Sequence, residues 1–446
     1  EEIAHLALLQ HKNPKRVLLL GGGISGTANE ILKYQPERID YIELDPSLVE
    51  MAQKYLPQAI KHSLEAPSVN LIVTDGRKFL RHTNEMYDAI LIDMPEPTSG
   101  STNRFYTREF FANCANRLRA DGIIAFRLPS AEQYWTPNLA RRNTSIYRAV
   151  KAAFSDVITL PGTENIFIAS NASLTRNPEI VAQRFQERNI TARLIHPLYI
   201  RYLYTNDRFA EIEKTLHNTI APTNSDLKPI CYQLTLLVWL SRFYRPIADF
   251  QIMAAGWIWL LLIPFAFVFW MIRKRIVVSK LFLIALAGFA GMVIEFAVLL
   301  RFQTASGILF RDIGLLLAGF MAGLAMSPMI GRWAAGRTQG GQLLVGSLGI
   351  LCFTSAFLFH WDGMRYTITG VAWLFLTGCN VGALFCYATE KIREKGASFY
   401  AADLLGGSIG ALIGSIILLP SLGLDIGAIW VGSIVVSGMI LSTANE

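Results

Sequence analysis

Apolar and polar positions divide the chain into two parts. Up to about residue 250, short apolar runs such as Val17 to Leu20 alternate with longer stretches of helical periodicity, and charged residues are frequent. Strands that alternate with helices predict an α/β domain with a mostly parallel sheet. We place this domain at residues 1–228. Because the opening residues, EEIAHLALLQH, are typical of the middle of a helix, we expect further sequence upstream of them.

The second part consists of long apolar blocks with short charged breaks. A helix needs about 20 apolar residues, at about 1.5 Å each, to cross a bilayer. Many blocks are rich in glycine and alanine, which let helices approach closely. We predict a connector at 229–250 and an all-α transmembrane bundle at 251–446. The candidate spans number seven and lie near 251–272, 281–301, 308–331, 342–361, 366–389, 401–420 and 424–442.

Composition and charge narrow the possible function classes. Apolar residues make up 52% of the 446 residues and charged residues only 17%, which is unusual for a soluble protein. The net charge of +7 forms no basic stripe interleaved with aromatic residues, so we expect no nucleic-acid partner. The five cysteines lack the spacing of a zinc site or of a disulfide framework, and we expect no bound metal.

Four consecutive predicted strands end in groups that suit a ligand. The first strand runs into the glycine-rich turn Gly21 to Gly26, and the next three end at Glu43, Asp75 and Asp93. In parallel sheets the ligand lies outside the carboxyl ends of the strands, and an acid about 20 residues after a glycine turn is typical of nucleotide-binding βαβ units. Glu43 is suited to accept ribose hydroxyls and Asp75 to accept an adenine amino group. The alternative for any one acid is a helix cap.

The segments GGG..G, YIELDP, DGRKFL and YDAILIDMPEP, in this order, resemble the spermidine synthase family. The resemblance covers roughly residues 1–170. It is nearest to the membrane-fused branch, whose loop after the fourth strand is similar to NRFYTREFF, residues 103–111. It implies a Rossmann-like fold of the class I methyltransferase type and an amine substrate. It also implies a co-substrate, either decarboxylated S-adenosylmethionine or S-adenosylmethionine, and no metal.

The same resemblance implies roles for individual residues. Asp93 is expected to be the catalytic base that takes a proton from the amine, which then displaces a thioether from a sulfonium. The residues expected to line the co-substrate are Gly21, Gly23, Gly26, Glu43 and Asp75.

Two positions depart from the family pattern. The acid that usually follows the third glycine, and that resembles a clamp on the aminopropyl ammonium, is Ile24 here. The second acid of the Asp-x-x-Asp-Pro loop is Glu96, which is one methylene longer and which we expect to contact the substrate. Arg104 and Tyr106 follow in the same loop. For both there are two alternatives, a place at the mouth of the substrate pocket or packing beneath the loop.

Glu295 is an isolated acid deep in the second predicted span. A charge at that depth costs on the order of ~3 kcal/mol on insertion scales. Three alternatives remain open. Glu295 pairs with Arg301 or Arg311, it is protonated and hydrogen-bonded between helices, or it lines a transport path and is then an intramembrane functional residue.

Basic residues are unevenly distributed over the predicted span ends. With seven spans, the side that holds the α/β domain has three of them, and the opposite side has nine. The positive-inside rule makes the nine-base side cytoplasmic. We therefore predict a multi-pass protein of the cell (inner) membrane. The charge bias favours the non-cytoplasmic side for the α/β domain, where S-adenosylmethionine is scarce. Two alternatives stay open: one span is miscounted, or the domain does face outward and is no longer a conventional enzyme.

Three functions are compatible with these features. The first is a membrane-embedded enzyme that binds S-adenosylmethionine, decarboxylated or not, and transfers an aminopropyl group to an amine. The second is a catalytically inactive spermidine synthase-like subunit or scaffold, with membrane-complex subunits or further copies of itself as partners. The third is a polyamine-linked transporter, which depends mainly on Glu295.

Overall fold

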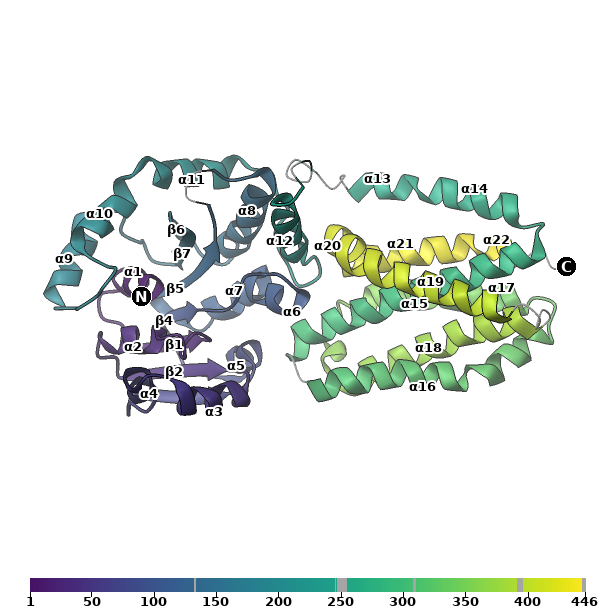
Figure 1. Cartoon of the computed structure of the whole chain (residues 1–446), viewed down its shortest axis with the longest axis horizontal. Helices are drawn as coiled ribbons and strands as arrows, with labels where there is room; N and C mark the ends of the chain where they lie inside the picture. The colour runs from purple at the N-terminus through teal and green to yellow at the C-terminus, as the bar shows by residue number, and fades with distance from the viewer. Residues whose placement is uncertain (132–133, 245, 247–254, 308–309, 391–395, 443–446) are drawn as a thin grey trace. The chain divides into compact units, whose positions relative to one another are not determined.

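The computed structural model describes residues 1–131, 134–244, 246, 255–307, 310–390 and 396–442. Within these residues the chain forms two compact units (Figure 1). The first unit holds Glu1–Asp226 and helix α12 (Ile230–Ser241), which lies inside the predicted connector. The second unit holds Leu227–Pro229 and the described residues from Ala255 onward.

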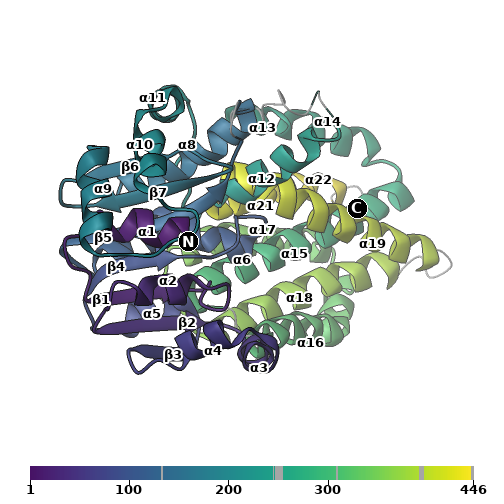
Figure 2. The ribbon, with the colours of Figure 1, turned by 60° about the vertical axis from the view of Figure 1, so that its left-hand side comes forward.

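A seven-stranded sheet forms the centre of the first unit, in the order β3-β2-β1-β4-β5-β7-β6 (Figure 2). Strands β1 to β5 run parallel, and β7 is antiparallel to its neighbours β5 and β6. The predicted α/β fold of the methyltransferase type is thereby confirmed. The strands are β1 (Arg16–Leu20), β2 (Arg38–Glu43), β3 (Val69–Val73), β4 (Tyr87–Ile92), β5 (Leu118–Pro129), β6 (Asp156–Leu160) and β7 (Glu164–Ser170).

Successive strand residues pack on opposite faces of this sheet. Leu18 and Ile90 share an apolar cluster with residues of α5, α7 and α8, whereas Val17 and Leu91 share one with α1, α2, α9 and α10. Because helices cover both faces, the strands are continuously apolar instead of alternating. The helices of this unit are α1 (Glu2–Leu8), α2 (Thr27–Leu32), α3 (Pro46–Tyr55), α4 (Gln58–Leu64), α5 (Gly76–His82), α6 (Gly100–Asn103), α7 (Arg108–Ala115), α8 (Pro137–Lys151), α9 (Pro178–Glu187), α10 (Pro197–Thr205), α11 (Asp207–Asn218) and α12.

The second unit is helical, and its described residues form six helices long and apolar enough to cross a membrane. They lie at the positions of six of the seven predicted spans. The first predicted span, 251–272, is partly outside the described residues, and its described part forms α13 (Ala255–Leu260) and α14 (Leu262–Ile272). The six long helical segments are Ile276–Ser306, Arg311–Ala335, Gly340–Leu358, Thr367–Glu390, Gly396–Leu422 and Leu424–Ser442.

Glycines permit close helix packing in this unit. Helices α16 (Phe310–Ala335) and α18 (Thr367–Glu390) lie side by side in Figures 1 and 2. A Cβ atom added to Gly323 would overlap the carbonyl of Phe375, and one added to Gly378 would overlap the carbonyl of Phe320. The helices therefore touch backbone to backbone, as small residues at helix interfaces allow. The remaining helices are α15 (Ile276–Ser306), α17 (Gly340–Leu358), α19 (Gly396–Ile413), α20 (Leu419–Leu422), α21 (Leu424–Ser437) and α22 (Met439–Ser442).

Candidate active site

The predicted site residues gather at the carboxyl edge of the parallel strands. The glycine turn joins β1 to α2, Glu43 is the last residue of β2, and Asp93 follows β4 directly. Asp75 comes two residues after β3 and is the N-cap of α5. The edge that holds them is the one at which open α/β sheets bind ligands.

The turn needs glycine for two separate reasons. Gly21, Gly22 and Gly26 have φ angles of 71°, 69° and 100°, a region that other residues rarely adopt. Space is also limited, because a Cβ atom on Gly22 would overlap the Asp93 carboxylate, and one on Gly23 would overlap the ring of Tyr41. The backbone of the turn therefore lies directly against the end of β4.

Glu43 is fixed by its own neighbours. Its Oε2 accepts a hydrogen bond from the Tyr41 hydroxyl at 2.8 Å, and its Oε1 accepts one from the Leu44 amide at 2.8 Å. Burial, and then the hydrogen bond to Glu43, raise the pKa of Tyr41, which stays a neutral donor. Oε1 also accepts from the Asp45 amide at 3.4 Å, so the remaining acceptor capacity for a ligand hydroxyl lies on Oε2.

Asp75 has the helix-capping role considered as the alternative, and its contact with an adenine stays a prediction. One carboxylate oxygen caps α5 by accepting from the Lys78 amide at 3.0 Å, and the other accepts from the Arg104 guanidinium. Arg104 comes from the loop after β4, and its side chain is fully buried. Of the two alternatives for Arg104, this position agrees with packing beneath the loop. It also brings a cation to the carboxylate that we expect to hold the adenine.

Asp93 is nearly enclosed, with 3% of its side chain exposed. Its Oδ2 accepts from the Thr27 hydroxyl at 2.8 Å and from the Ser25 hydroxyl at 3.4 Å. Its Oδ1 accepts from Nε and Nη2 of Arg127 at 2.9 and 2.8 Å. The expected base is therefore held by two hydroxyls and a guanidinium.

Arg127 also binds a second acid. Its Nη1 lies 2.6 Å from Oε2 of Glu164, at the start of β7. Burial alone would lower the pKa of Arg127, but the nearby carboxylates of Asp93 and Glu164 outweigh burial and raise it. The guanidinium is thus a fixed cation between two carboxylates.

Two cavities open beside this group. One, of about 300 Å³, lies between the glycine turn, the loop after β4 and the facing ends of β5 and β7. The other, of about 200 Å³, is lined by the starts of α1 and α2 and by β7. Ser25, Arg127 and Glu164 line both cavities, and Asp93 lines the larger one. A small ligand in either cavity would contact Arg127.

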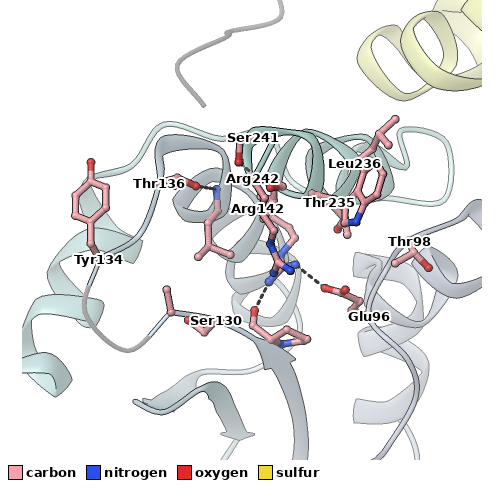
Figure 3. Close-up of a pocket in the computed structure, with 15 residues that line it drawn as sticks. Glu96, Thr98, Ser130, Tyr134, Thr136, Arg142, Thr235, Leu236, Ser241 and Arg242 are labelled. Atoms are coloured by element: carbon pink, nitrogen blue, oxygen red, sulfur yellow. Dashed lines mark hydrogen bonds and ion pairs between the residues drawn. The ribbon is translucent and has the colours of Figure 1, made fainter. Parts of the chain in front are cut away.

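Glu96 is also paired with an arginine. Its Oε2 lies 2.8 Å from Nη1 of Arg142, and Figure 3 shows the Arg142 side chain pointing toward it. Arg142 has 1% of its side chain exposed and also donates to the carbonyl of Pro129. Burial lowers the pKa of Arg142 despite the opposing effect of Glu96, but an arginine keeps its charge in proteins. The pair borders a third cavity, of about 400 Å³, whose lining includes Thr235 and Trp239 of α12. Figure 3 shows Thr235 and Leu236 on this helix.

Tyr106 is fully buried beneath the loop after β4. Its hydroxyl lies 3.0 Å from the carbonyl oxygens of both Met94 and Pro95. Burial raises its pKa, so the hydroxyl remains a donor. Of the two alternatives, this position agrees with packing, in which Tyr106 holds the loop that carries Glu96. A contact with the substrate stays a prediction.

A buried ion pair anchors the same loop to the end of the first unit. Arg77 binds Asp226 through two hydrogen bonds, Nη1 to Oδ1 at 2.8 Å and Nη2 to Oδ2 at 2.7 Å. Thr107 donates to Asp226 at 2.7 Å, and Arg77 donates to the carbonyl of Arg104 at 3.0 Å. Burial by itself would lower the pKa of Arg77, but Asp226 outweighs it and raises the pKa. Asp226 is thus a structural tether.

Glu295 lies within α15 with 4% of the residue exposed. Among the described residues it forms no ion pair with Arg301 or Arg311. Arg301 donates to the carbonyl of Phe359 at 2.6 Å, and Arg311 lies 3.5 Å from Asp312. The ion-pair alternative is therefore not what the structure shows.

One group of potential metal ligands occurs in the described part of the chain, formed by Glu1, His5 and Glu30. The His5 ring nitrogens lie 2.8 Å from Glu30 and 2.9 Å from the Tyr34 hydroxyl. Burial lowers the pKa of His5. Both ring nitrogens of His5 thus have hydrogen-bond partners, Glu30 and Tyr34.

Sequence reasoning missed Arg127, Arg142 and Glu164 as parts of the site. Arg127 is the only charge in the apolar strand segment GIIAFRLP, residues 122–129, and that position was a usable signal. Arg142 is one of several polar residues in an amphipathic helix and carries no comparable signal. Glu164 looks like an ordinary strand end.

Comparison with known proteins relates the first part of the chain to a family. Residues 1–173 match the family described as "Spermine/spermidine synthase domain". A polyamine aminopropyltransferase of Methanocaldococcus jannaschii is 38% identical over 125 residues, which are 28% of this chain and 42% of that protein. One of Clostridium perfringens (strain SM101 / Type A) is 35% identical over 155 residues, 34% of this chain and 52% of that protein. The chain thus spans about half, or less, of the length of these relatives.

Similar solved structures include a spermidine synthase in complex with the transition state analogue AdoDATO. It is 24% identical, with a TM-score of 0.42, and the similarity covers 49% of this chain and 74% of that chain. The resemblance drawn from the motifs is confirmed by the family match, which covers residues 1–173.

Proposed function

We propose that the first unit binds an adenosyl-sulfur co-substrate, decarboxylated S-adenosylmethionine or S-adenosylmethionine, and transfers an aminopropyl group from the decarboxylated form to an amine. The observation that carries this proposal is the family match over residues 1–173, within which the glycine turn, Glu43, Asp75 and Asp93 share one edge of the sheet. The relatives named above are polyamine aminopropyltransferases, which points to the same reaction class.

The residues at this edge fit the proposed co-substrate. A turn without room for a Cβ atom at Gly22 or Gly23 lets its backbone approach a ligand closely. We propose that Gly21, Gly23 and Gly26 line the co-substrate, that Glu43 holds its ribose and that Asp75 holds its adenine. Oε2 of Glu43 has acceptor capacity beyond the hydrogen bond that it accepts from Tyr41.

Asp93 is proposed as the base for the transfer. A protonated amine has no lone pair with which to attack, so a carboxylate must first take its proton. The nitrogen then forms a bond to the aminopropyl carbon as the carbon–sulfur bond breaks. The electrons of that bond pass to the sulfur, and the sulfonium leaves as a neutral thioether. Glu96 and Tyr106 are proposed to shape the neighbouring substrate cavity.

We further propose that the helical unit embeds the chain in the cell (inner) membrane. The number of crossings decides the side on which the domain lies. If residues 255–272 do not cross, the six long helices put the nine basic residues on the side of the domain, which the positive-inside rule makes cytoplasmic. With seven crossings the domain lies on the other side. Catalysis requires the domain to lie on the side of the membrane where the co-substrate is supplied.

A titration and a turnover assay test the proposal. Full-length protein in detergent is titrated with methylthioadenosine and decarboxylated S-adenosylmethionine, and turnover is followed with a panel of amines. Asp93→Asn is expected to abolish turnover and to keep co-substrate binding, because an amide cannot take the proton. If wild-type protein binds no adenosyl-sulfur compound, the proposal is wrong.

A second candidate is a non-catalytic subunit of a membrane complex. The observation in its favour is that Asp75, Asp93 and Glu96 are each paired with an arginine. This candidate predicts that adenosyl compounds do not bind and that partner proteins co-purify in fixed proportion. The same titration therefore separates the two candidates.

A further inference from the structure

We infer that Arg127 determines which class of amine this site accepts. Its guanidinium fills the position where a diamine would place one of its ammonium groups. The acceptor would then carry one amine and not two. This inference rests on the proposed function, because it names the substrate class of the same site.

The contacts of Arg127 are those expected of a bound ammonium. The guanidinium lies between Asp93 and Glu164, with nitrogen–oxygen distances of 2.8 and 2.6 Å. It lines both cavities beside Asp93, and 40% of its side chain is exposed. A cation in contact with two carboxylates and with open cavity space stands where a basic ligand would bind.

A charge count leads to the same class of acceptor. The larger cavity is lined by Asp93, Glu96 and Glu164. Arg142 neutralises Glu96, and Arg127 offsets one of the other two acids. One negative charge remains in this cavity, which suits a single ammonium there. The smaller cavity has two further acids outside this count, Glu1 and Glu2. A second ammonium would have no free carboxylate among these three.

Competition at Asp93 gives the expected size of the effect. A diamine that reached Asp93 with one end and Glu164 with the other would have to displace the guanidinium from both. A charge-assisted hydrogen bond is worth roughly 1.5–3 kcal/mol, so displacing Arg127 costs a diamine about tenfold or more in affinity. A monoamine can bind at Glu164 or Asp93 while Arg127 keeps the other acid.

Arg119 provides a matched control for this residue. It lies in the same strand, β5, has 41% of its side chain exposed and binds Asp88 at 2.7 Å. Because Arg119 lines none of the cavities beside Asp93, its loss removes a similar ion pair without opening the site. Arg127→Lys keeps a cation at the position and serves as the conservative variant.

The experiment compares 1,4-diaminobutane with butylamine. Full-length protein in detergent is titrated with each amine, both alone and with saturating methylthioadenosine, for the wild type, Arg127→Gln, Arg127→Lys and Arg119→Gln. We expect Arg127→Gln to raise the affinity for diaminobutane, relative to the affinity for butylamine, about tenfold or more over the wild type. Arg119→Gln and Arg127→Lys are expected to keep the wild-type preference.

Two results would overturn the inference. One is a folded Arg127→Gln protein, with an unchanged melting temperature, that shows no gain for diaminobutane. The other is a wild-type protein that already prefers diaminobutane by about tenfold. Failure of the proposed function would be seen separately, as absence of methylthioadenosine binding. The amine titrations in the absence of methylthioadenosine report on Arg127 alone.

Discussion

The buried pair of Arg77 and Asp226 makes the sharpest stability prediction. Arg77 has 1% of its side chain exposed and Asp226 11%, and two hydrogen bonds join them. Arg77→Met removes both of these hydrogen bonds from the buried Asp226 carboxylate, which also accepts from Thr107. Removing one partner of a buried pair costs roughly 3–5 kcal/mol. For a unit of this size that corresponds to a melting temperature lower by roughly 6–20 °C.

An exposed pair of the same geometry is the control. Arg201 binds Glu179 through two hydrogen bonds, both 2.8 Å, but the side chains are 44% and 61% exposed. Exposed pairs contribute about 0–1 kcal/mol, so Arg201→Met is expected to lower the melting temperature by less than about 4 °C. The two pairs differ in burial and in the further hydrogen bonds that join Arg77 to Arg104 and Asp226 to Thr107.

Thermal unfolding of the full-length protein in detergent, followed by intrinsic fluorescence, measures both variants. The double variant Arg77→Met/Asp226→Leu is expected to recover part of the loss, because no charge is left buried without its partner. If Arg77→Met and Arg201→Met melt within about 2 °C of each other, burial does not set the cost of losing these pairs.

Three further variants probe the site and the membrane arrangement. Gly22→Ala is expected to weaken methylthioadenosine binding more than about tenfold, and Gly26→Ala much less. Both glycines have a positive φ, but only Gly22 lacks space for a Cβ atom. Titrations that show equal losses of affinity for the two variants would refute this. Ile24→Asp is expected to raise the affinity for decarboxylated S-adenosylmethionine about tenfold relative to that for S-adenosylmethionine, because the new carboxylate would attract the aminopropyl ammonium and repel the carboxylate of S-adenosylmethionine. Competition binding that gives the same ratio of the two affinities as the wild type would contradict this. The enzyme proposal predicts that Gln53→Cys, at an exposed position of α3, reacts with an impermeant maleimide only after permeabilisation of cells, because the domain is then cytoplasmic; labelling of intact cells would favour the non-catalytic candidate.

The elements that carry the site were predictable because their signals are local. The apolar runs became strands, and the glycine turn and the acids at the strand ends lie at one edge of the sheet because parallel strands align their carboxyl ends. The third and fourth strands end beside Asp75 and Asp93 as expected. Strand β6 and helices α9 to α11 were not predicted, although α11 is amphipathic and buries Ile212 and Leu216.

What the sequence determined by itself is therefore the fold class, the glycine turn and the identity of the acids. Only the tertiary structure decided the partners of these acids. Arg127 is 34 residues from Asp93, Arg142 is 46 from Glu96, and Asp226 is 149 from Arg77. Periodicity and spacing report contacts between near neighbours, whereas an ion pair between distant elements depends on how β5, α8 and α5 pack. The charge of the site, and with it the class of acceptor, follows from that packing.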